Sequence, residues 1–461
     1  MVKQRLFGTD GVRGVVNEWL TPENALRLGL AIGSYFNAGD RILVGCDGRA
    51  GNNFIVNAVI AGLVSTGVKV YYAGLTPTPA LQFYVKSKGF DAGVMITASH
   101  NPPEYSGVKV VLSDGVEAPR NVEEAIEEIY AELRFRRVSW TGLGINVQEI
   151  SDVNDFYVNS ILSHIDKERI RRKEWKVVVD CANNVGSLTT PKMLRELGVK
   201  VLTINCDVSH IPYREPEPTA NSLRETSLIV KLVGADFGVA HDGDADRAIF
   251  IDKLGRVLPG DRSGVMLCEH VLTNKELRIP KKVVTAVSSS TIVEEVLSNY
   301  GVEIVWTKVG SINIARTMMR KNIMLGFEEN GGFLYGSHQF VRDGAMATAL
   351  MLEYLAYTNM ELHEIYNKLP QMHVIKTKVN IEPSLKDNIM SFIKSRILSE
   401  FSNDRIIDID GVKIINPEYL FLVRPSGTEP ILRIFIEAKN EELANKLLNK
   451  LLNIVNEVRG K

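Results

Sequence analysis

The sequence lacks the features that mark secreted, zinc-binding or membrane proteins. Its cysteines stand singly, with no C-x-x-C pair, at Cys46, Cys181, Cys206 and Cys268. We therefore expect neither a disulfide framework nor a zinc site, and interpret all of them as ordinary thiols. The first residues contain no apolar signal segment, and no later apolar run is as long as a transmembrane helix. We expect a protein of the reducing cytoplasm that does not bind a membrane.

An excess of charge of one sign is also missing, because 54 Lys and Arg residues nearly balance 55 Asp and Glu residues. Such a balance does not provide the basic surface of a nucleic-acid-binding protein, so we expect a small molecule as the partner. There is no Walker A loop, since the only Gly-Lys pair is Gly460-Lys461, and no G-x-G-x-x-G opens a helix. These absences disfavour phosphoryl transfer from a nucleotide.

The length of 461 residues predicts several domains. Short apolar runs alternate with segments of helical periodicity, which is typical of βα units and largely parallel sheets. Three apolar runs, at 92–96, 236–240 and 323–326, are each followed by a polar loop, which suggests a repeat of one α/β domain type. A smaller α+β domain follows. The expected domains span 1–150, 151–254, 255–370 and 371–461.

The strongest chemical signal is the segment 241–247, which places Asp242, Asp244 and Asp246 at every second position. Three crowded carboxylates repel one another, and their oxygens are the ligands that hard divalent cations prefer. An EF-hand is rejected, because its required Gly and Glu positions hold Arg247 and Lys253. We predict a magnesium site with room for a phosphate oxygen; the alternative is a solvated acidic turn.

A second segment, 97–102, places Ser99 directly after an apolar run and before two prolines. A serine at the end of a buried strand, in a stiffened loop, is suited to act as a nucleophile or phosphate carrier. The same residue types also form ordinary turns. Lys109, a few residues further on, would supply a cation or an acid–base group.

A third segment, 424–430, lies between two apolar strands and reads Arg-Pro-Ser-Gly-Thr-Glu-Pro, with Arg433 just beyond it. A guanidinium, hydroxyls and backbone N–H groups together suit a phosphate dianion, although a hairpin turn is the alternative. Two glycine-rich segments complete the set. Residues 7–14 contain the cation Arg13, and residues 326–332 contain Glu328 and Asn330, whose oxygens suit sugar hydroxyls.

Together and in this order, these segments resemble the motifs of the α-D-phosphohexomutase superfamily, which comprises phosphoglucomutases, phosphomannomutases and phosphoglucosamine mutases. The resemblance covers the whole chain. It implies an α/β fold of three similar mixed-sheet α/β domains plus a C-terminal α+β domain around a central cleft. It also implies a Mg²⁺-dependent isomerase that moves a phosphoryl group between positions 1 and 6 of a hexose, through a phosphoserine and a hexose 1,6-bisphosphate.

The resemblance also assigns expected roles to individual residues. Ser99 would carry the phosphoryl group, and Asp242, Asp244 and Asp246 would bind Mg²⁺ together with an oxygen of that phosphate. The residues expected around the transferred group are Arg13, His100, Lys109 and Arg247. The residues expected to bind the sugar and its other phosphate are Gly310, Ser311, Glu328, Asn330, Arg424, Ser426, Gly427, Thr428 and Arg433.

The sequence departs from the usual pattern where the sugar is recognised. Asn330 and Gly332 stand where many relatives have Ser and His, Ser311 follows Val309-Gly310 in place of His or Asp, and Ser106 replaces a frequent Asn. A phosphoglucomutase/phosphomannomutase of broad specificity is the first expectation, and a phosphoglucosamine mutase is the alternative. Other hypotheses are a phosphoserine-dependent sugar phosphatase and a catalytically silent sugar-phosphate-binding protein. The sequence does not indicate the oligomeric state.

Overall fold

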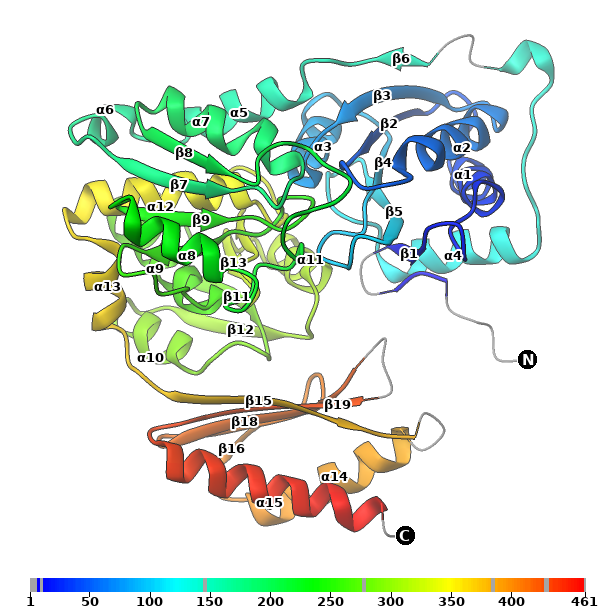
Figure 1. Cartoon of the computed structure of the whole chain (residues 1–461). Coiled ribbons are helices and arrows are strands. Elements are labelled where there is room, and N and C mark those ends of the chain that lie inside the picture. Colours follow the sequence, from blue (N-terminus) through cyan, green and yellow to red (C-terminus); the bar gives the residue numbers. More distant parts are fainter. Residues whose placement is uncertain are drawn as a thin grey trace.

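The computed structural model describes residues 6–8, 11–143, 147–275, 279–382, 386–426 and 431–459. Its described strands form four sheets, with helices packed against them (Figure 1). The first three sheets are mixed and the last is antiparallel. This arrangement confirms the predicted fold of three similar α/β domains and a C-terminal α+β domain. No helix among the described residues combines the length and the apolar character needed to cross a membrane.

The first domain has a sheet with the strand order β1-β5-β4-β2-β3-β6. These strands are β1 (Val12–Val15), β2 (Arg41–Cys46), β3 (Lys69–Leu75), β4 (Ala92–Ile96), β5 (Tyr105–Leu112) and β6 (Gln148–Glu149). Its helices are α1 (Pro22–Tyr35), α2 (Asn52–Ser65), α3 (Thr78–Ser87) and α4 (Arg120–Ala131). Helix α1 begins with Thr21 as its N-cap, whose side chain accepts a hydrogen bond from Asn24 N. Alternate strand residues face two cores, because side chains alternate across a strand: Val44 contacts the α1–α2 side and Leu43 the α3 side.

The second and third domains have sheets of four strands each. The second contains β7 (Lys176–Asp180), β8 (Lys200–Ile204), β9 (Phe237–Ala240) and β10 (Ile249–Asp252), with α5 (Val153–Ser163), α6 (Lys167–Ile170), α7 (Thr190–Glu196) and α8 (Arg224–Leu232). The third contains β11 (Lys282–Ala286), β12 (Glu303–Thr307), β13 (Leu325–Phe327) and β14 (Phe333–Tyr335), with α9 (Gly260–Asn274), α10 (Ile292–Ser298), α11 (Ser311–Lys321), α12 (Gly344–Thr358) and α13 (Leu362–Lys368). One large core joins α3, α5, α9 and α12, and so unites the three domains.

The three mixed sheets share one topology. In each, four consecutive strands take the spatial order fourth, third, first, second, as in β5-β4-β2-β3, β10-β9-β7-β8 and β14-β13-β11-β12. The first strand is parallel to the second and third, and the fourth is antiparallel to the third. Each of the three apolar runs singled out in the sequence overlaps the third strand of its sheet, which is β4, β9 or β13. The loops that follow them are therefore equivalent positions of a repeated fold.

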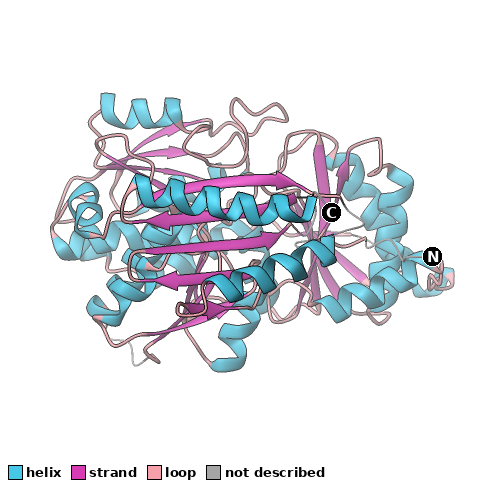
Figure 2. Cartoon of the chain, turned by 90° about the horizontal axis from the view of Figure 1, so that it is seen from below, coloured by secondary structure: helices cyan, strands magenta, loops and turns pink. Residues whose placement is uncertain are grey.

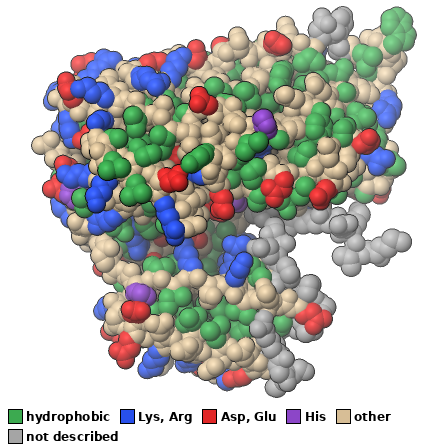
Figure 3. Space-filling model, viewed as in Figure 1, with side chains coloured by type: hydrophobic (Ala, Val, Ile, Leu, Met, Phe, Trp, Pro, Cys, Tyr) green, Lys and Arg blue, Asp and Glu red, His purple; other side chains and the backbone are tan. Residues whose placement is uncertain are grey.

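The C-terminal domain is an antiparallel sheet with the order β15-β19-β18-β17-β16. Its strands are β15 (His373–Asn380), β16 (Arg405–Ile407), β17 (Val412–Asn416), β18 (Tyr419–Pro425) and β19 (Ile431–Ala438), and its helices are α14 (Lys386–Glu400) and α15 (Glu441–Arg459). Both helices cover one face of this sheet (Figure 2). The other face contacts Trp306 and Val287 of the third domain. Figure 3 shows a hollow between this domain and the rest, with Lys and Arg side chains at its edges.

The prediction that all four cysteines are ordinary thiols is wrong for Cys181 and Cys206, which form a disulfide with their Cα atoms 4.8 Å apart. The two residues follow the neighbouring parallel strands β7 and β8, whose last pair is Asp180 and Ile204. A pairing across 25 positions depends on this strand register and leaves no local spacing to recognise. Cys46 and Cys268 are free and buried, as expected.

Candidate active site

The loop after β4 in the first domain contacts the loop after β9 in the second domain. Ser99, in the loop after β4, donates a hydrogen bond from Oγ to Asp242 Oδ2 at 2.8 Å, across 143 positions of sequence. Asp242 lies in the loop after β9, and both side chains are buried. The repeated topology thus brings the candidate nucleophile and the acidic loop together at the carboxyl ends of parallel strands, where open α/β sheets usually bind ligands.

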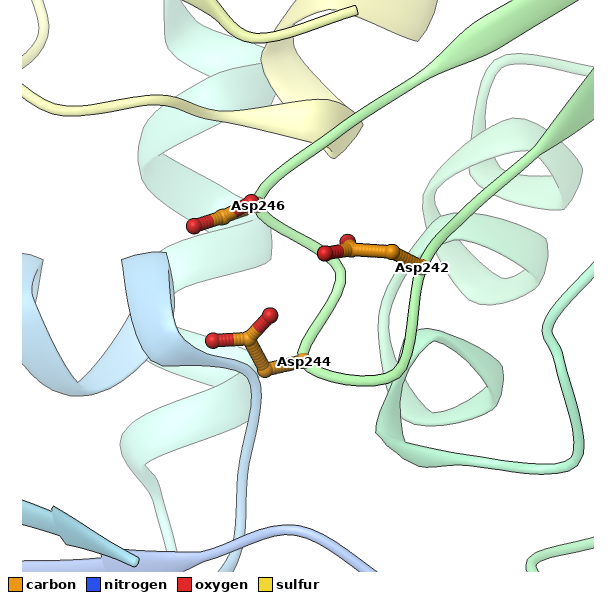
Figure 4. A group of neighbouring side chains, drawn as sticks. All are labelled: Asp242, Asp244 and Asp246. Carbon is orange, nitrogen blue, oxygen red and sulfur yellow. The ribbon is translucent and has the colours of Figure 1, made fainter. Parts of the chain in front are cut away.

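Asp242, Asp244 and Asp246 offer one carboxylate oxygen each within 4.8 Å of one another. Figure 4 shows the three side chains projecting from a single loop toward a common space. Asp246 Oδ1 is buried and accepts no hydrogen bond from the described residues. Burial and the neighbouring carboxylates raise the pKa of Asp242 and of Asp246. The donor set fits a hard divalent cation, which would favour the ionised form of these groups.

Three cationic side chains surround the acidic loop. Lys109 Nζ lies 3.0 Å from Asp244 Oδ2 and 4.0 Å from Asp246 Oδ2. Arg247 Nε lies 3.7 Å from Asp242 Oδ2, and Arg342 contacts Asp246 from a different segment. All are buried, so their charges act in a medium that screens little. The loop is therefore held in a dense, alternating arrangement of charges that suits an anionic ligand.

The loop of Ser99 is held in an unusual backbone conformation. Ser99 has a φ of 52°, in the left-handed region that a residue with a side chain seldom adopts. The Arg49 guanidinium donates to the carbonyl groups of Ser99, Asn101, Pro102 and Tyr105, at distances from 2.5 to 3.0 Å. Asp47 fixes Arg49 in turn, with an Nε to Oδ2 distance of 3.3 Å. This clamp keeps the serine in the orientation that reaches Asp242.

His100 and Arg13 flank the serine. Arg247 donates from NH2 to His100 Nδ1 at 2.9 Å, and the positive charge of Arg247, together with burial, lowers the pKa of His100 to about 2. The imidazole is therefore neutral at physiological pH. Arg13, on β1, donates to the side-chain oxygen of Asn101. Both predicted neighbours of the serine are thus brought to its loop.

The sugar loop, residues 328–332 after β13, carries the predicted sugar-binding residues Glu328 and Asn330. Glu328 is buried, and its Oε1 accepts a hydrogen bond from Gly310 N at 3.1 Å. Asn330 Oδ1 accepts from Gly332 N at 3.1 Å, while its Nδ2 lies 3.5 Å from Glu328 Oε2. Ser311 begins α11 directly after Gly310. The hydrogen bond from Gly310 N to Glu328 therefore joins the segments 309–311 and 328–332.

Arg424 and Arg433, which are predicted to bind a phosphate, lie at the ends of β18 and β19, where the two residues are paired in register. Arg424 NH2 lies 3.2 Å from Asp410 Oδ2. The same carboxylate oxygen accepts a hydrogen bond from Val309 N at 3.2 Å, which connects the C-terminal domain to the segment 309–311 of the third domain. Ser426 N donates to Ile431 O at 2.9 Å. Gly427 and Thr428 lie outside the described residues.

Sequence reasoning missed several residues that hold this site. Thr78, at the start of α3, donates from Oγ1 to Asp244 Oδ2 at 2.6 Å. Arg49 contacts Ser99 across 50 positions, Asp47 contacts Thr97 across 50 positions and Arg342 contacts Asp246 across 96 positions. Asp410 contacts Arg424 and Val309. Only Asp47 and Arg49 carried a signal, since they follow the apolar run 42–45 in the same way as the other loops follow theirs.

Family models of four successive domains match the chain. They describe phosphoglucomutase/phosphomannomutase alpha/beta/alpha domains I, II and III at residues 4–137, 155–255 and 259–373, and the C-terminal domain at residues 379–454. The fold is also found in solved structures. A phosphoglucomutase/phosphomannomutase family protein from Burkholderia thailandensis has a TM-score of 0.88 at 24% identity, covering 100% of this chain and 98% of that chain.

Two curated relatives match over nearly their full length. The phosphoglucosamine/phosphogalactosamine mutase of Sulfurisphaera tokodaii is 52% identical over 454 residues, covering 98% of this chain and 99% of the relative. The phosphoglucomutase/phosphomannomutase of Thermococcus kodakarensis is 39% identical over 458 residues, with the same coverage of 98% and 99%. The chain therefore belongs to the phosphoglucomutase/phosphomannomutase family of the α-D-phosphohexomutase superfamily, a family of mutases.

Proposed function

We propose that the protein is a phosphohexomutase that interconverts the 1-phosphate and the 6-phosphate of a hexosamine through a phosphoryl group carried on Ser99. The observation that carries this proposal is the contact between Ser99 Oγ and Asp242, in the middle of the acidic loop and its cations. Phosphoryl transfer depends mainly on positioning and on neutralising the phosphate oxygens, and this arrangement supplies both.

Asp242, Asp244 and Asp246 would hold Mg²⁺, and a phosphate on Ser99 would supply a further oxygen ligand. When bound, the cation would withdraw charge from the phosphoryl oxygens. Lys109 and Arg247 lie within 4.0 Å of these carboxylates and would neutralise the remaining oxygens of the same group. These groups together would hold a phosphoryl group on Ser99.

The sugar would lie between the reactive centre and the C-terminal domain. Glu328 and Asn330 would accept hydrogen bonds from its hydroxyls, with Gly310 and Ser311 beside them. Arg424, Ser426, Gly427, Thr428 and Arg433 would hold the phosphate that does not react. Phospho-Ser99 would transfer its phosphoryl group to the free hydroxyl of the sugar: the bond from phosphorus to Ser99 Oγ breaks, the bond to the sugar oxygen forms, and the hydroxyl proton ends on Oγ. The resulting hexose 1,6-bisphosphate would reorient and return its other phosphoryl group to Ser99 by the reverse step.

The sugar is the finer part of the proposal. The 52% identical relative is named for glucosamine and galactosamine phosphates, which supports an amino sugar as the first choice. The 39% identical relative is named for glucose and mannose phosphates, which makes them the second candidate and matches the first expectation from the sequence. We also propose a cytoplasmic protein. The Cys181–Cys206 disulfide argues against this location, because such bonds are rare in a reducing cytoplasm, intracellular proteins of hyperthermophiles excepted.

A coupled assay with the 1-phosphates of glucosamine, galactosamine, glucose and mannose tests the proposal, with a trace of the matching bisphosphate to prime Ser99. We expect turnover of all four, fastest with an amino sugar, and none in Ser99→Ala. Steady release of inorganic phosphate would indicate the phosphatase instead, because a mutase excludes water from the transferred group. Binding without turnover would indicate the silent sugar-phosphate-binding protein.

A further inference from the structure

Arg342 connects the acidic loop to the sugar loop. It precedes α12, and its side chain is buried. NH2 donates to Asp246 Oδ2 at 2.5 Å, and NH1 donates to Glu328 Oε2 at 3.2 Å. One planar guanidinium thus contacts a carboxylate from the second repeat and a carboxylate from the third, and its fork fixes the two at a set separation.

Gly332 makes room for this side chain. A Cβ atom at Gly332 would lie 2.3 Å from Arg342 Cδ and 2.7 Å from Arg342 Cγ, closer than atoms can approach. The backbone of Gly332 does not have a positive φ, so its conformation does not require glycine. The absence of a side chain at this position is therefore explained by the path of Arg342 across it.

The segment that follows Arg342 packs against the acidic loop, and the acidic loop is hydrogen-bonded to the sugar loop. A Cβ atom at Gly344 would lie 2.6 Å from Arg247 O and 2.8 Å from Ala245 O, so the start of α12 touches the backbone of the acidic loop. Ala248 N donates to Gly331 O at 3.0 Å, which joins the end of the acidic loop to the sugar loop. Arg342 therefore lies in a rigid frame in which its two carboxylate partners can be held accurately.

We propose that Arg342 is a positioning residue that aligns the cation site with the sugar loop, and that Gly332 is required because it leaves space for Arg342. The proposal rests on the proposed function. By binding Asp246 Oδ2, Arg342 would leave the other oxygen, the buried Oδ1, for a cation. By binding Glu328 Oε2, it leaves Glu328 oriented by both Arg342 and Gly310 N. Groups that orient metal ligands typically change metal affinity or activity by about 10–100-fold.

Arg342→Lys is the direct test, because it keeps the charge and removes the fork. Mn²⁺ binding to the protein without substrate, measured by electron paramagnetic resonance, should weaken about tenfold. In the mutase assay the KM for the sugar phosphate should rise, since Glu328 loses its orientation. Gly332→Ala should produce the same two changes by displacing Arg342. In the Arg342→Lys background, Gly332→Ala should add little, because both changes remove one interaction.

Arg256→Lys is the matched control. Arg256 also joins two segments through its guanidinium, with Asp252 at 2.7 Å and Asn367 at 2.8 Å, but away from the site. It should leave Mn²⁺ affinity and KM unchanged. Wild-type Mn²⁺ affinity and KM in both Arg342→Lys and Gly332→Ala would overturn the inference, and so would additive effects of the two changes. Mn²⁺ binding is measured without turnover, so the inference stays testable even if wild type shows no mutase activity.

Discussion

The hydrogen bonds from Arg49 to the Ser99 loop give the most detailed prediction. Arg49 donates to the carbonyls of Ser99, Asn101, Pro102 and Tyr105 with one guanidinium. Lysine carries the same charge but has three donors on a single nitrogen, so Arg49→Lys cannot serve the same four oxygens in the same geometry. The loop should relax away from the left-handed conformation of Ser99.

The expected loss of stability in Arg49→Lys follows from the carbonyl groups that lose their hydrogen-bond donor. Each buried carbonyl that loses its partner costs about 1–3 kcal/mol, so Arg49→Lys should lower the free energy of unfolding by at least one such contribution. A displacement of the reacting oxygen by about 1 Å typically costs about 10²-fold in rate. We therefore expect kcat to fall about 10²-fold, with a smaller change in the KM for the sugar phosphate.

Arg136→Lys provides a control within the same domain. The Arg136 guanidinium donates to the carbonyls of Gly33, Phe36 and Thr66 at 2.6 to 2.8 Å, away from the serine. Urea unfolding should show a comparable loss of stability in both variants, whereas the mutase assay should show a loss of kcat only in Arg49→Lys. Equal kcat in Arg49→Lys and wild type, at a reduced stability, would refute the positioning role of Arg49.

Three further predictions concern the acidic loop, His100 and the disulfide. Asp244→Asn should raise the Mg²⁺ concentration needed for half-maximal activity about 10–100-fold and should lower kcat by a similar factor. Both quantities are measured by titrating the activity with Mg²⁺. A titration curve identical to that of wild type would contradict the assignment of Asp244 as a metal ligand. The pKa of His100 is about 2 beside Arg247 against an ordinary 6.5, so only the unfolded chain takes up this proton between these values. The contribution of the neutral imidazole to stability is therefore present above pH 6.5 and is lost as the pH falls below it. His100→Asn should weaken the fall in the free energy of unfolding between pH 7 and 5. A fall identical to that of wild type would contradict the lowered pKa of His100. The Cys181–Cys206 bond closes a loop of 25 positions, so its reduction should lower the free energy of unfolding by about 3 kcal/mol. Urea unfolding with and without a reductant measures this difference. In Cys181→Ser the reductant should no longer change the free energy of unfolding.

The sequence allowed much of the fold to be predicted because the loops that carry chemistry follow equivalent strands. The apolar runs that end at Ile96, Ala240 and Gly326 each precede a polar loop, and all three are third strands of one repeated topology. That pattern is local, since a buried strand and its loop are contiguous in sequence. It was enough to predict three similar domains and to select Ser99, Asp242 and Glu328.

Interactions between segments that are far apart in the sequence left no comparable signal. Arg342 contacts Asp246 across 96 positions and Arg49 contacts Ser99 across 50, and neither distance is visible in any spacing of residue types. The Cys181–Cys206 pair was missed for the same reason, because it depends on the register of two strands. The sugar preference depends on a few side chains around Glu328 and Asn330, which accept hydrogen bonds from hydroxyl and ammonium groups alike.

The most direct test of the central claim is a single-turnover transfer from the serine itself. The protein is phosphorylated with a hexose 1,6-bisphosphate, freed of excess sugar, and mixed with glucosamine 6-phosphate in the presence of Mg²⁺, while intact-mass spectrometry follows the phosphate adduct. We predict that the adduct is absent in Ser99→Ala, disappears from wild type on mixing, and is recovered as sugar bisphosphate. An adduct that persists in Ser99→Ala, or that wild type releases as inorganic phosphate, would contradict the mechanism.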